Sequence, residues 1–206
     1  MARGDFEPTA HGWDSIDLAC QELYGDQAPK HVGYTPGRAF GTVLQGCSAY
    51  RADTYWHYVT YGLSNIYDEI EEDNGGLSGW GYELTWRVRD DSVPADHAPG
   101  WPFTILQRIA KWANDKPLLL DPGVRLPLNQ PVTGFPHTGG PDTALTVLAV
   151  VEDPNLGRID TPNGSVQFLQ FVGVTEQDWH SMQETTNLSV IDDLRRSDPL
   201  LVTKVG

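Results

Sequence analysis

Basic residues are scarce in this sequence. Its 206 residues include 14 Lys and Arg against 28 Asp and Glu, which gives a formal net charge of −14. A chain with this charge repels phosphate backbones and anionic lipid surfaces, so we expect neither nucleic acid nor a membrane as a partner. The acidity itself has two interpretations: it keeps the protein soluble, or it steers a basic protein partner toward the surface.

Cysteine and long apolar runs are also lacking. With only Cys20 and Cys47, cysteine can build neither a disulfide framework nor a four-thiolate zinc site, and we expect two reduced, partly buried thiols. No apolar run approaches the roughly 20 residues of a membrane-spanning helix, and residues 1–8 lack the apolar core of a secretory signal. The sequence therefore predicts a cytoplasmic protein.

Motifs that carry catalysis are missing as well. There is no phosphate-binding Gly-rich loop, nucleophile elbow, paired-His zinc helix or calcium loop. The best acid–base candidates are His57 and Glu83, with Asp153 and Glu152 at a turn, so a hydrolytic enzyme that uses a His57, Glu83 and Asp153 cluster is one alternative. His57 lies among aromatic residues, where a structural hydrogen bond is the commoner role, and no histidine has metal-site spacing. We expect no cofactor and no metal.

The chain does contain helical and strand patterns in mixed order, without repeats, and its length suits a single domain over residues 1–206. Gly25 caps the first predicted helix and Pro102 suits the first turn of the second. Residues 116–141, rich in proline and glycine, form either a long ordered loop or a mobile flap. The predicted helices cover 13–24, 102–113, a segment that starts at Thr175, and 188–196; the predicted strands cover 40–43, 48–51, 55–61, 80–89 and parts of 143–174.

Large apolar residues occupy every second position from Trp80 to Val88, and polar residues such as Glu83 and Arg87 lie between them. This period of two predicts a half-buried strand, with Trp80 and Trp86 in the core. Trp112 lies off the apolar stripe of its helix, so it either packs under the following loop or stands in a binding surface. Several coplanar exposed tryptophans would instead indicate a carbohydrate-binding protein.

Two turn signals interrupt residues 151–174. Asp153, Pro154 and Asn155 with Gly157 predict one turn. Asn163 and Gly164 form the dipeptide that most readily supplies positive φ at both central positions of a type I′ turn, so they predict a tight hairpin. Gly164→Val would then destabilise the hairpin by roughly 1–2 kcal/mol, since a β-branched residue is strained at positive φ.

Three segments together carry a family resemblance. They are the turn-rich block 151–174, the run His57-Tyr58-Val59 before Gly62-Leu63-Ser64, and Ser78-Gly79-Trp80-Gly81-Tyr82-Glu83-Leu84-Thr85. In this order they resemble the suppressor of fused (SUFU) family, over about residues 13–179, with a helical tail over about 180–206. The resemblance implies an α+β fold, with a central, largely antiparallel sheet and packed helices.

The resemblance also implies a function in binding other proteins. Animal members hold a transcription-factor peptide in extended form between two lobes, and Trp112 and Glu152 match positions near the peptide-binding side. We expect no second lobe within this chain, because it ends at Gly206. Compact members in bacteria have been proposed as immunity proteins that neutralise toxins.

The sequence therefore predicts a non-catalytic binding module that is a monomer or weak homodimer. Its predicted partner is a basic toxin domain, and the alternative is a regulator that binds a short extended peptide. The candidate contact residues are Trp112, Glu152, Asp153 and the acidic loop residues Glu71, Glu72 and Asp73.

Overall fold

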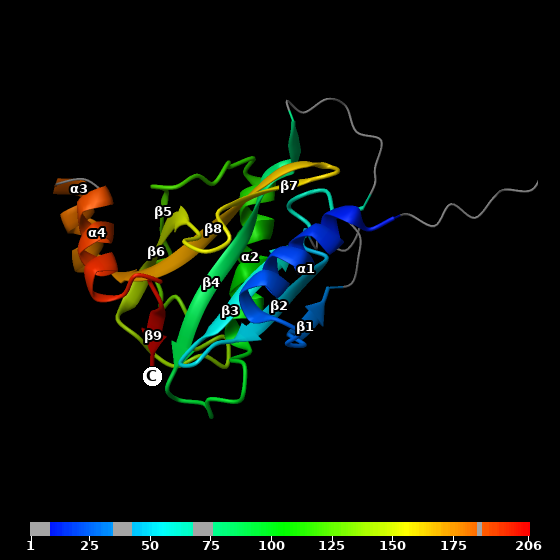
Figure 1. The fold of residues 1–206 in the computed structure, drawn as a ribbon. Coiled ribbons are helices and arrows are strands. Elements are labelled where there is room, and N and C mark those ends of the chain that lie inside the picture. Colours follow the sequence, from blue (N-terminus) through cyan, green and yellow to red (C-terminus); the bar gives the residue numbers. More distant parts are fainter. Residues whose placement is uncertain (1–8, 35–42, 68–75, 185–186) are drawn as a thin grey trace, which may run out of the picture.

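The computed structural model describes residues 9–34, 43–67, 76–184 and 187–206. Its helices are α1 (His11–Tyr24), α2 (Trp101–Asp115), α3 (Glu176–Glu184) and α4 (Asn187–Ser197). Its strands are β1 (Lys30–Gly33), β2 (Gly46–Arg51), β3 (Trp56–Tyr61), β4 (Leu77–Asp90), β5 (Arg125–Pro127), β6 (Leu145–Glu152), β7 (Arg158–Thr161), β8 (Gly164–Thr175) and β9 (Thr203–Val205) (Figure 1).

The strands form one mixed sheet in the order β1-β2-β3-β4-β8-β6-β5, with β7 paired to β8 and β9 paired to β4. Only the β4–β8 and β4–β9 pairs among these are parallel; the others are antiparallel. This confirms the predicted α+β fold with a largely antiparallel sheet. The strand expected at 40–43 falls mostly outside the described residues.

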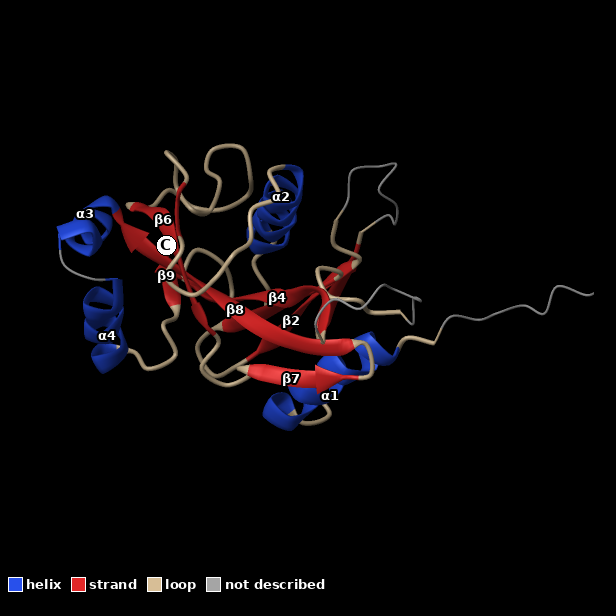
Figure 2. Cartoon of the chain, turned by 90° about the horizontal axis from the view of Figure 1, so that it is seen from above, coloured by secondary structure: helices blue, strands red, loops and turns tan. Residues whose placement is uncertain are grey.

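Helices cover both faces of the sheet. Figure 2 shows α2 on one side, α1 on the opposite side beside β7, and α3 and α4 at the β6 end. The α2 face is aromatic: Trp86 meets Trp101 edge to face with ring centroids 5.1 Å apart, and Tyr58 meets Phe103 at 5.0 Å. Edge-to-face pairs stabilise the fold beyond the burial of their apolar surface. The largest cluster of buried apolar residues in the described part of the chain lies on this face.

The helix termini follow the local signals in the sequence. Gly25 has a φ of +61° and its N–H donates to the Gln21 carbonyl, as a glycine cap requires. Thr175 and Asp178 bond to each other's backbone N–H groups at 3.0 and 3.1 Å, a capping box that starts α3. Pro102 lies in the first turn of α2, as predicted.

The segment 116–141 is a packed loop. Leu120, Leu126 and Val132 are buried, and β5 pairs with β6.

The chain after Pro199 was expected to belong to a helical tail, but residues 203–205 form β9, whose Thr203 hydroxyl accepts from the Trp86 indole and the Gly173 N–H. The prediction of a helical tail is therefore wrong for these residues, because pairing with β4 is a long-range interaction.

The hairpin between β7 and β8 is present, but its turn is not type I′. Thr161 pairs with Gly164, so Pro162 and Asn163 are the central residues, and Asn163 is not among the residues with positive φ. Pro162 fixes φ near −65° at the first central position, which type I′ does not allow. Gly164 does have a φ of +107°, and a Cβ there would lie 2.7 Å from the Leu77 backbone carbon.

Candidate functional site

A network of buried polar side chains lies on the α1 side of the sheet. The β3–β4 register places His57 opposite Arg87, and the turn after β6 brings Asp153 between them. The Asp153 Oδ2 atom accepts from His57 Nε2 at 3.0 Å and from Arg87 NH1 at 2.7 Å, while Oδ1 accepts from Arg87 NH2 at 3.0 Å. All three side chains are buried. The pairing therefore compensates two buried charges.

The predicted turn at Asp153 holds the carboxylate in place. Asp153 Oδ1 accepts from the backbone N–H groups of Asn155 and Leu156 at 2.9 and 3.0 Å, and Thr85 Oγ1 donates to Oδ2 at 2.7 Å. Arg87 also donates to Asn155 Oδ1 at 3.0 Å and to Gln170 Oε1. The turn residue thus anchors a connection between β4, β6 and β8.

The charges of this network follow from burial and pairing. Burial alone would raise the pKa of Asp153, but the hydrogen bonds from His57 and Arg87 and the charge of Arg87 hold that pKa well below its usual range. Burial and the Arg87 charge together lower the pKa of His57. A neutral His57 donates from Nε2 to the carboxylate, so its Nδ1 accepts from the Tyr24 hydroxyl, 2.8 Å away on α1.

Glu83 lies in a separate buried site at the end of β3. Its Oε1 atom accepts from the backbone N–H groups of Gly62, Leu63 and Ser64 at 2.8–3.0 Å and from the Ser64 hydroxyl at 2.7 Å. Oε2 accepts from Thr60 Oγ1 at 2.6 Å. Burial raises the pKa of Glu83 to about 7, against the opposing effect of these hydrogen bonds. Glu83 therefore fixes the chain reversal after β3.

The proposed catalytic cluster is thus only partly assembled. His57 and Asp153 bond to each other, but each Glu83 hydrogen bond joins it to the 60–64 segment instead. His57 and Glu83 have no exposed surface and Asp153 is 1% exposed, so none is placed to contact a substrate. Their contacts are those of structural residues.

Sequence reasoning missed Arg87, the cation at the centre of this network. Its position between apolar residues indicates the far side of a half-buried strand, yet β4 is buried on both faces over most of its length. The expectation of a half-buried strand is wrong because the 60–64 segment and the 153–156 turn meet the second face, where Ser64 bonds to Glu83 and Asp153 and Asn155 bond to Arg87. A buried arginine beside a buried histidine has no local signal in the sequence.

The predicted contact residues differ in their exposure. Glu152 is exposed at the end of β6, but Asp153 is buried and its carboxylate is fully engaged, so the expectation that Asp153 contacts a partner is wrong for this structure. Glu71, Glu72 and Asp73 lie outside the described residues. Asn163 has a structural function: its side-chain amide donates to the carbonyls of Asn65 and Tyr67 at 2.9 and 3.1 Å.

Trp112 is the exposed aromatic residue that the sequence singled out. It is 44% exposed near the C-terminal end of α2, and Leu119 in the following segment is 55% exposed. Large apolar side chains at this exposure cost free energy in water and are enriched at protein contacts. Trp112 and Leu119 together are called the α2-end patch below. In contrast, Trp86 is fully buried and Trp80 is half-buried against the same core, broadly as expected.

Both cysteines are free, as the sequence predicted, and they are fully rather than partly buried. In the part of the chain that the structure describes, no three His, Cys, Asp or Glu side chains are grouped so as to hold a metal ion. No helix there is both long enough and apolar enough to span a bilayer.

Comparison with known proteins identifies the family. Residues 42–206 match the family described as Suppressor of fused protein (SUFU). The chain is also 30% identical over 148 residues to the suppressor of fused homologs of Homo sapiens and Mus musculus. These matches cover 68% of this chain and 28% of each relative. The chain belongs to the SUFU family and aligns with under a third of the length of these relatives.

Solved structures support the assignment. A Sufu–Fu complex structure is 27% identical, with a TM-score of 0.83 over 95% of this chain and 90% of that one. Drosophila Suppressor of Fused is also 27% identical, with a TM-score of 0.84 over 95% of this chain and 50% of the other. A SUFU homolog from Neisseria gonorrhoeae, 12% identical with a TM-score of 0.60 over 90% and 89% of the two chains, shares the fold.

Proposed function

We propose that this chain is a non-catalytic protein-binding module. Its family membership supports this, because a structural relative was solved as a complex named for its two proteins, Sufu and Fu. The observation that carries the proposal is the contrast between engaged polar groups and exposed apolar ones. The His57, Asp153 and Glu83 side chains are buried and bonded, whereas Trp112 and Leu119 are exposed.

The finer proposal is that the module is a bacterial cytoplasmic immunity protein that binds a basic toxin domain. The net charge of −14 supports a basic partner, because opposite charge raises the association rate at low salt. Neutralisation by occlusion needs a preformed surface and no chemistry. We propose that the protein acts as a monomer or weak homodimer and that the α2-end patch and Glu152 contact the partner.

A second candidate is a regulator that binds a short extended peptide. The observation in its favour is the position of β5, the last strand in the sheet order, whose outer edge pairs with no other described strand. An open edge offers backbone groups to an extended segment. The partner of this candidate is a linear peptide rather than a folded domain.

The test is binding to the product of the gene beside this one, if that gene encodes a basic toxin domain. The two proteins are co-expressed and purified, and the dissociation constant is measured by calorimetry. Trp112→Ala should weaken binding roughly tenfold or more, since exposed aromatic anchors dominate interfaces. Leu119→Ala is compared with Leu18→Ala, because Leu18 is 58% exposed on α1 across the sheet and Leu119 is 55% exposed.

The control variant and the salt dependence test the contact surface and the steering, and binding of a linear peptide distinguishes the two candidates. Leu18→Ala should leave the dissociation constant unchanged, and the association rate should fall as salt rises. Equal weakening by both leucine variants would reject the α2-end patch as the contact. A neighbouring product that does not bind, together with binding of only a linear peptide, would reject the immunity proposal and favour the second candidate.

A further inference from the structure

The β1 edge of the sheet has unpaired backbone groups whose direction follows from the strand register. β1 pairs antiparallel with β2, with Val32 opposite Cys47 and Gly33 opposite Gly46. In an antiparallel pair, residues alternate between bonding to the partner strand and pointing away from it. Whether the odd- or the even-numbered residues of β2 bond toward β1 therefore determines which backbone groups of β1 point outward.

Two hydrogen bonds at the end of β2 show which of its residues bond toward β1. The Ala52 N–H donates to Tyr55 on the β3 side, while the N–H of Arg51 bonds at 2.6 Å to the side chain of Gln27, on the β1 side. The odd-numbered β2 residues, Cys47 among them, therefore bond toward β1. The Tyr34 N–H donates to the Gln45 carbonyl at 2.9 Å, which fits the same pattern, whereas the N–H of Gln45, which precedes β2, donates to Tyr61 on the β3 side.

It follows that Lys30 and Val32 bond inward to β2, whereas the N–H and C=O groups of His31 and Gly33 point outward. Among the described strands none pairs with this edge. All four residues of β1 are exposed. An added strand could therefore form backbone hydrogen bonds at His31 and Gly33 without disturbing the sheet.

A groove lies beside this edge, between β1 and α2. Its volume is about 580 Å³, and its lining residues are Val32, Tyr34, Gly100, Phe103, Thr104, Gln107 and Arg108. This size is within the roughly 300–1,000 Å³ of typical ligand pockets. The Tyr34 hydroxyl donates to the Phe103 carbonyl at 2.8 Å, which ties the end of β1 to α2. The groove is mostly apolar, with Val32 37% exposed in it.

One residue that lines the groove has a polar atom without a partner. The Gln107 Oε1 atom is buried and accepts no hydrogen bond from the described residues. A buried acceptor left unpaired costs free energy that a ligand with one donor would recover. The groove is thus suited to a large apolar group that carries a single N–H, which is the chemistry of an indole.

The charge at this edge differs from that of the whole protein. Lys30 and Arg108 are both exposed, at one end of β1 and in the groove wall, although the chain carries a net charge of −14. The local cations favour acidic side chains beside the apolar one.

We propose that the β1 edge binds an extended segment of a partner protein as an added strand, with a tryptophan in the α2 groove and acidic residues beside it. The outward groups of His31 and Gly33 supply the backbone bonds, Gln107 Oε1 accepts the indole N–H, and Arg108 pairs with an acidic side chain. The β1 edge and the groove are formed by other residues than Trp112 and Leu119, so the proposal does not depend on the toxin partner.

The probe is the acetylated and amidated heptapeptide Thr-Glu-Thr-Trp-Thr-Glu-Thr, in which alternate residues face the groove. Its counterparts replace Trp by Phe, or both Glu by Lys. Binding is measured by fluorescence titration of dye-labelled peptides. The Trp peptide should bind about three- to tenfold more tightly than the Phe peptide, the size of one hydrogen bond. The Lys peptide should bind at least tenfold more weakly.

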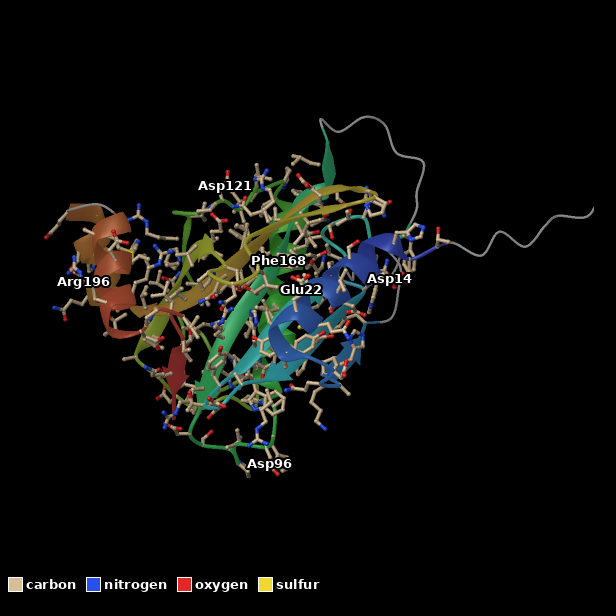
Figure 3. The ribbon with its side chains drawn as sticks, in the orientation of Figure 1. Asp14, Glu22, Asp96, Asp121, Phe168 and Arg196 are labelled. Carbon is tan, nitrogen blue, oxygen red and sulfur yellow. The ribbon has the colours of Figure 1, made fainter. Side chains whose placement is uncertain are left out.

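Matched variants assign these differences to the groove. Gln107→Leu removes the acceptor and should abolish the preference for Trp over Phe. Arg108→Glu should reverse the preference for the acidic peptide, whereas Arg196→Glu, at an exposed position of α4 (Figure 3), should not change it. Gly33→Pro deletes an outward N–H and should weaken all peptides, and a melting curve checks that it folds.

Hydrogen exchange gives a second, independent measurement on the unaltered chain. The amides of His31 and Gly33 should exchange rapidly alone and become protected on addition of the Trp peptide. Protection elsewhere without change at these two amides would overturn the proposal. A Trp preference that persists in Gln107→Leu would overturn the indole assignment, as would equal affinity for acidic and basic peptides.

Discussion

The same strands build both faces of the central sheet, but one face buries aromatic side chains and the other buries charged and polar ones. Toward α2, β3 and β4 present Tyr58 and Trp86, which pack against aromatic residues of the helix. Toward α1, the adjacent residues His57 and Arg87 are equally buried but meet Asp153. The apolar face needs volume and shape, whereas the polar face needs partners for its buried charges and donors, and of the Arg87 donors only Nε has none among the described residues.

This difference predicts how each face fails. A buried ion pair contributes little net free energy compared with a well-packed apolar group, but removing one member leaves the other charge buried and unpaired. Truncation of an apolar side chain on the other face leaves a cavity that neighbouring side chains partly fill. The polar face is therefore the more sensitive to a change of one atom type.

The largest effect is expected from Asp153→Asn. The substitution keeps the shape of the side chain but leaves the Arg87 charge uncompensated, so the free energy of unfolding should fall by about 3–5 kcal/mol. Urea denaturation followed by tryptophan fluorescence measures it. The control is Asp121→Asn, an exposed residue (Figure 3), which should change stability by less than about 0.5 kcal/mol. Equal stability of the two variants would show that the Asp153 charge is dispensable.

Leu106→Ala probes the apolar face. Leu106 is fully buried on α2, and its truncation should cost about 2–4 kcal/mol through reduced burial and a residual cavity. Leu18→Ala on the exposed side of α1 is the matched control and should have little effect. A cost for Leu106→Ala that exceeds that of Asp153→Asn would invert the comparison between the faces.

The pH dependence of Glu83→Gln sharpens the comparison further. The Glu83 pKa is raised from 4.5 to about 7 in the folded state, so the folded protein holds a proton that the unfolded chain releases between these values. The Glu83 contribution to stability is therefore greatest below pH 4.5 and is lost as pH rises to 7. The difference in unfolding free energy, wild type minus Glu83→Gln, should grow by up to about 3 kcal/mol from pH 7 to 4.5.

His57 acts in the opposite direction over the same range. Its pKa is lowered in the folded state, so stability falls as pH drops below the usual histidine value and the unfolded chain takes up a proton. In Glu83→Gln this decrease is no longer offset, and acid destabilisation should be steeper than in the wild type. Parallel stability curves for the two proteins between pH 7 and 4.5 would contradict the raised Glu83 pKa.

Several features were predictable from the sequence because they depend on neighbouring residues. The cap at Gly25, the capping box at Thr175 and the turn at Asp153 each rest on one side chain and nearby backbone. The turn at residues 162–163 was predicted in the wrong form, because Pro162, rather than Gly164, occupies a central position. The hairpin itself was predicted correctly, but the type I′ turn with Asn163 and Gly164 at its centre was not.

The amino-acid sequence alone was enough to establish the family, the α+β fold class, most element positions and the burial of Trp86. These follow from periodicity, turn chemistry and ordered motifs, all of which are local along the chain. The three-dimensional arrangement was needed to show that Arg87 is buried, that Glu83 lies apart from His57 and Asp153, and that residues 203–205 join the sheet. A charge is buried only when a distant residue compensates it, and a partner such as Asp153, 66 positions from Arg87, has no local signature.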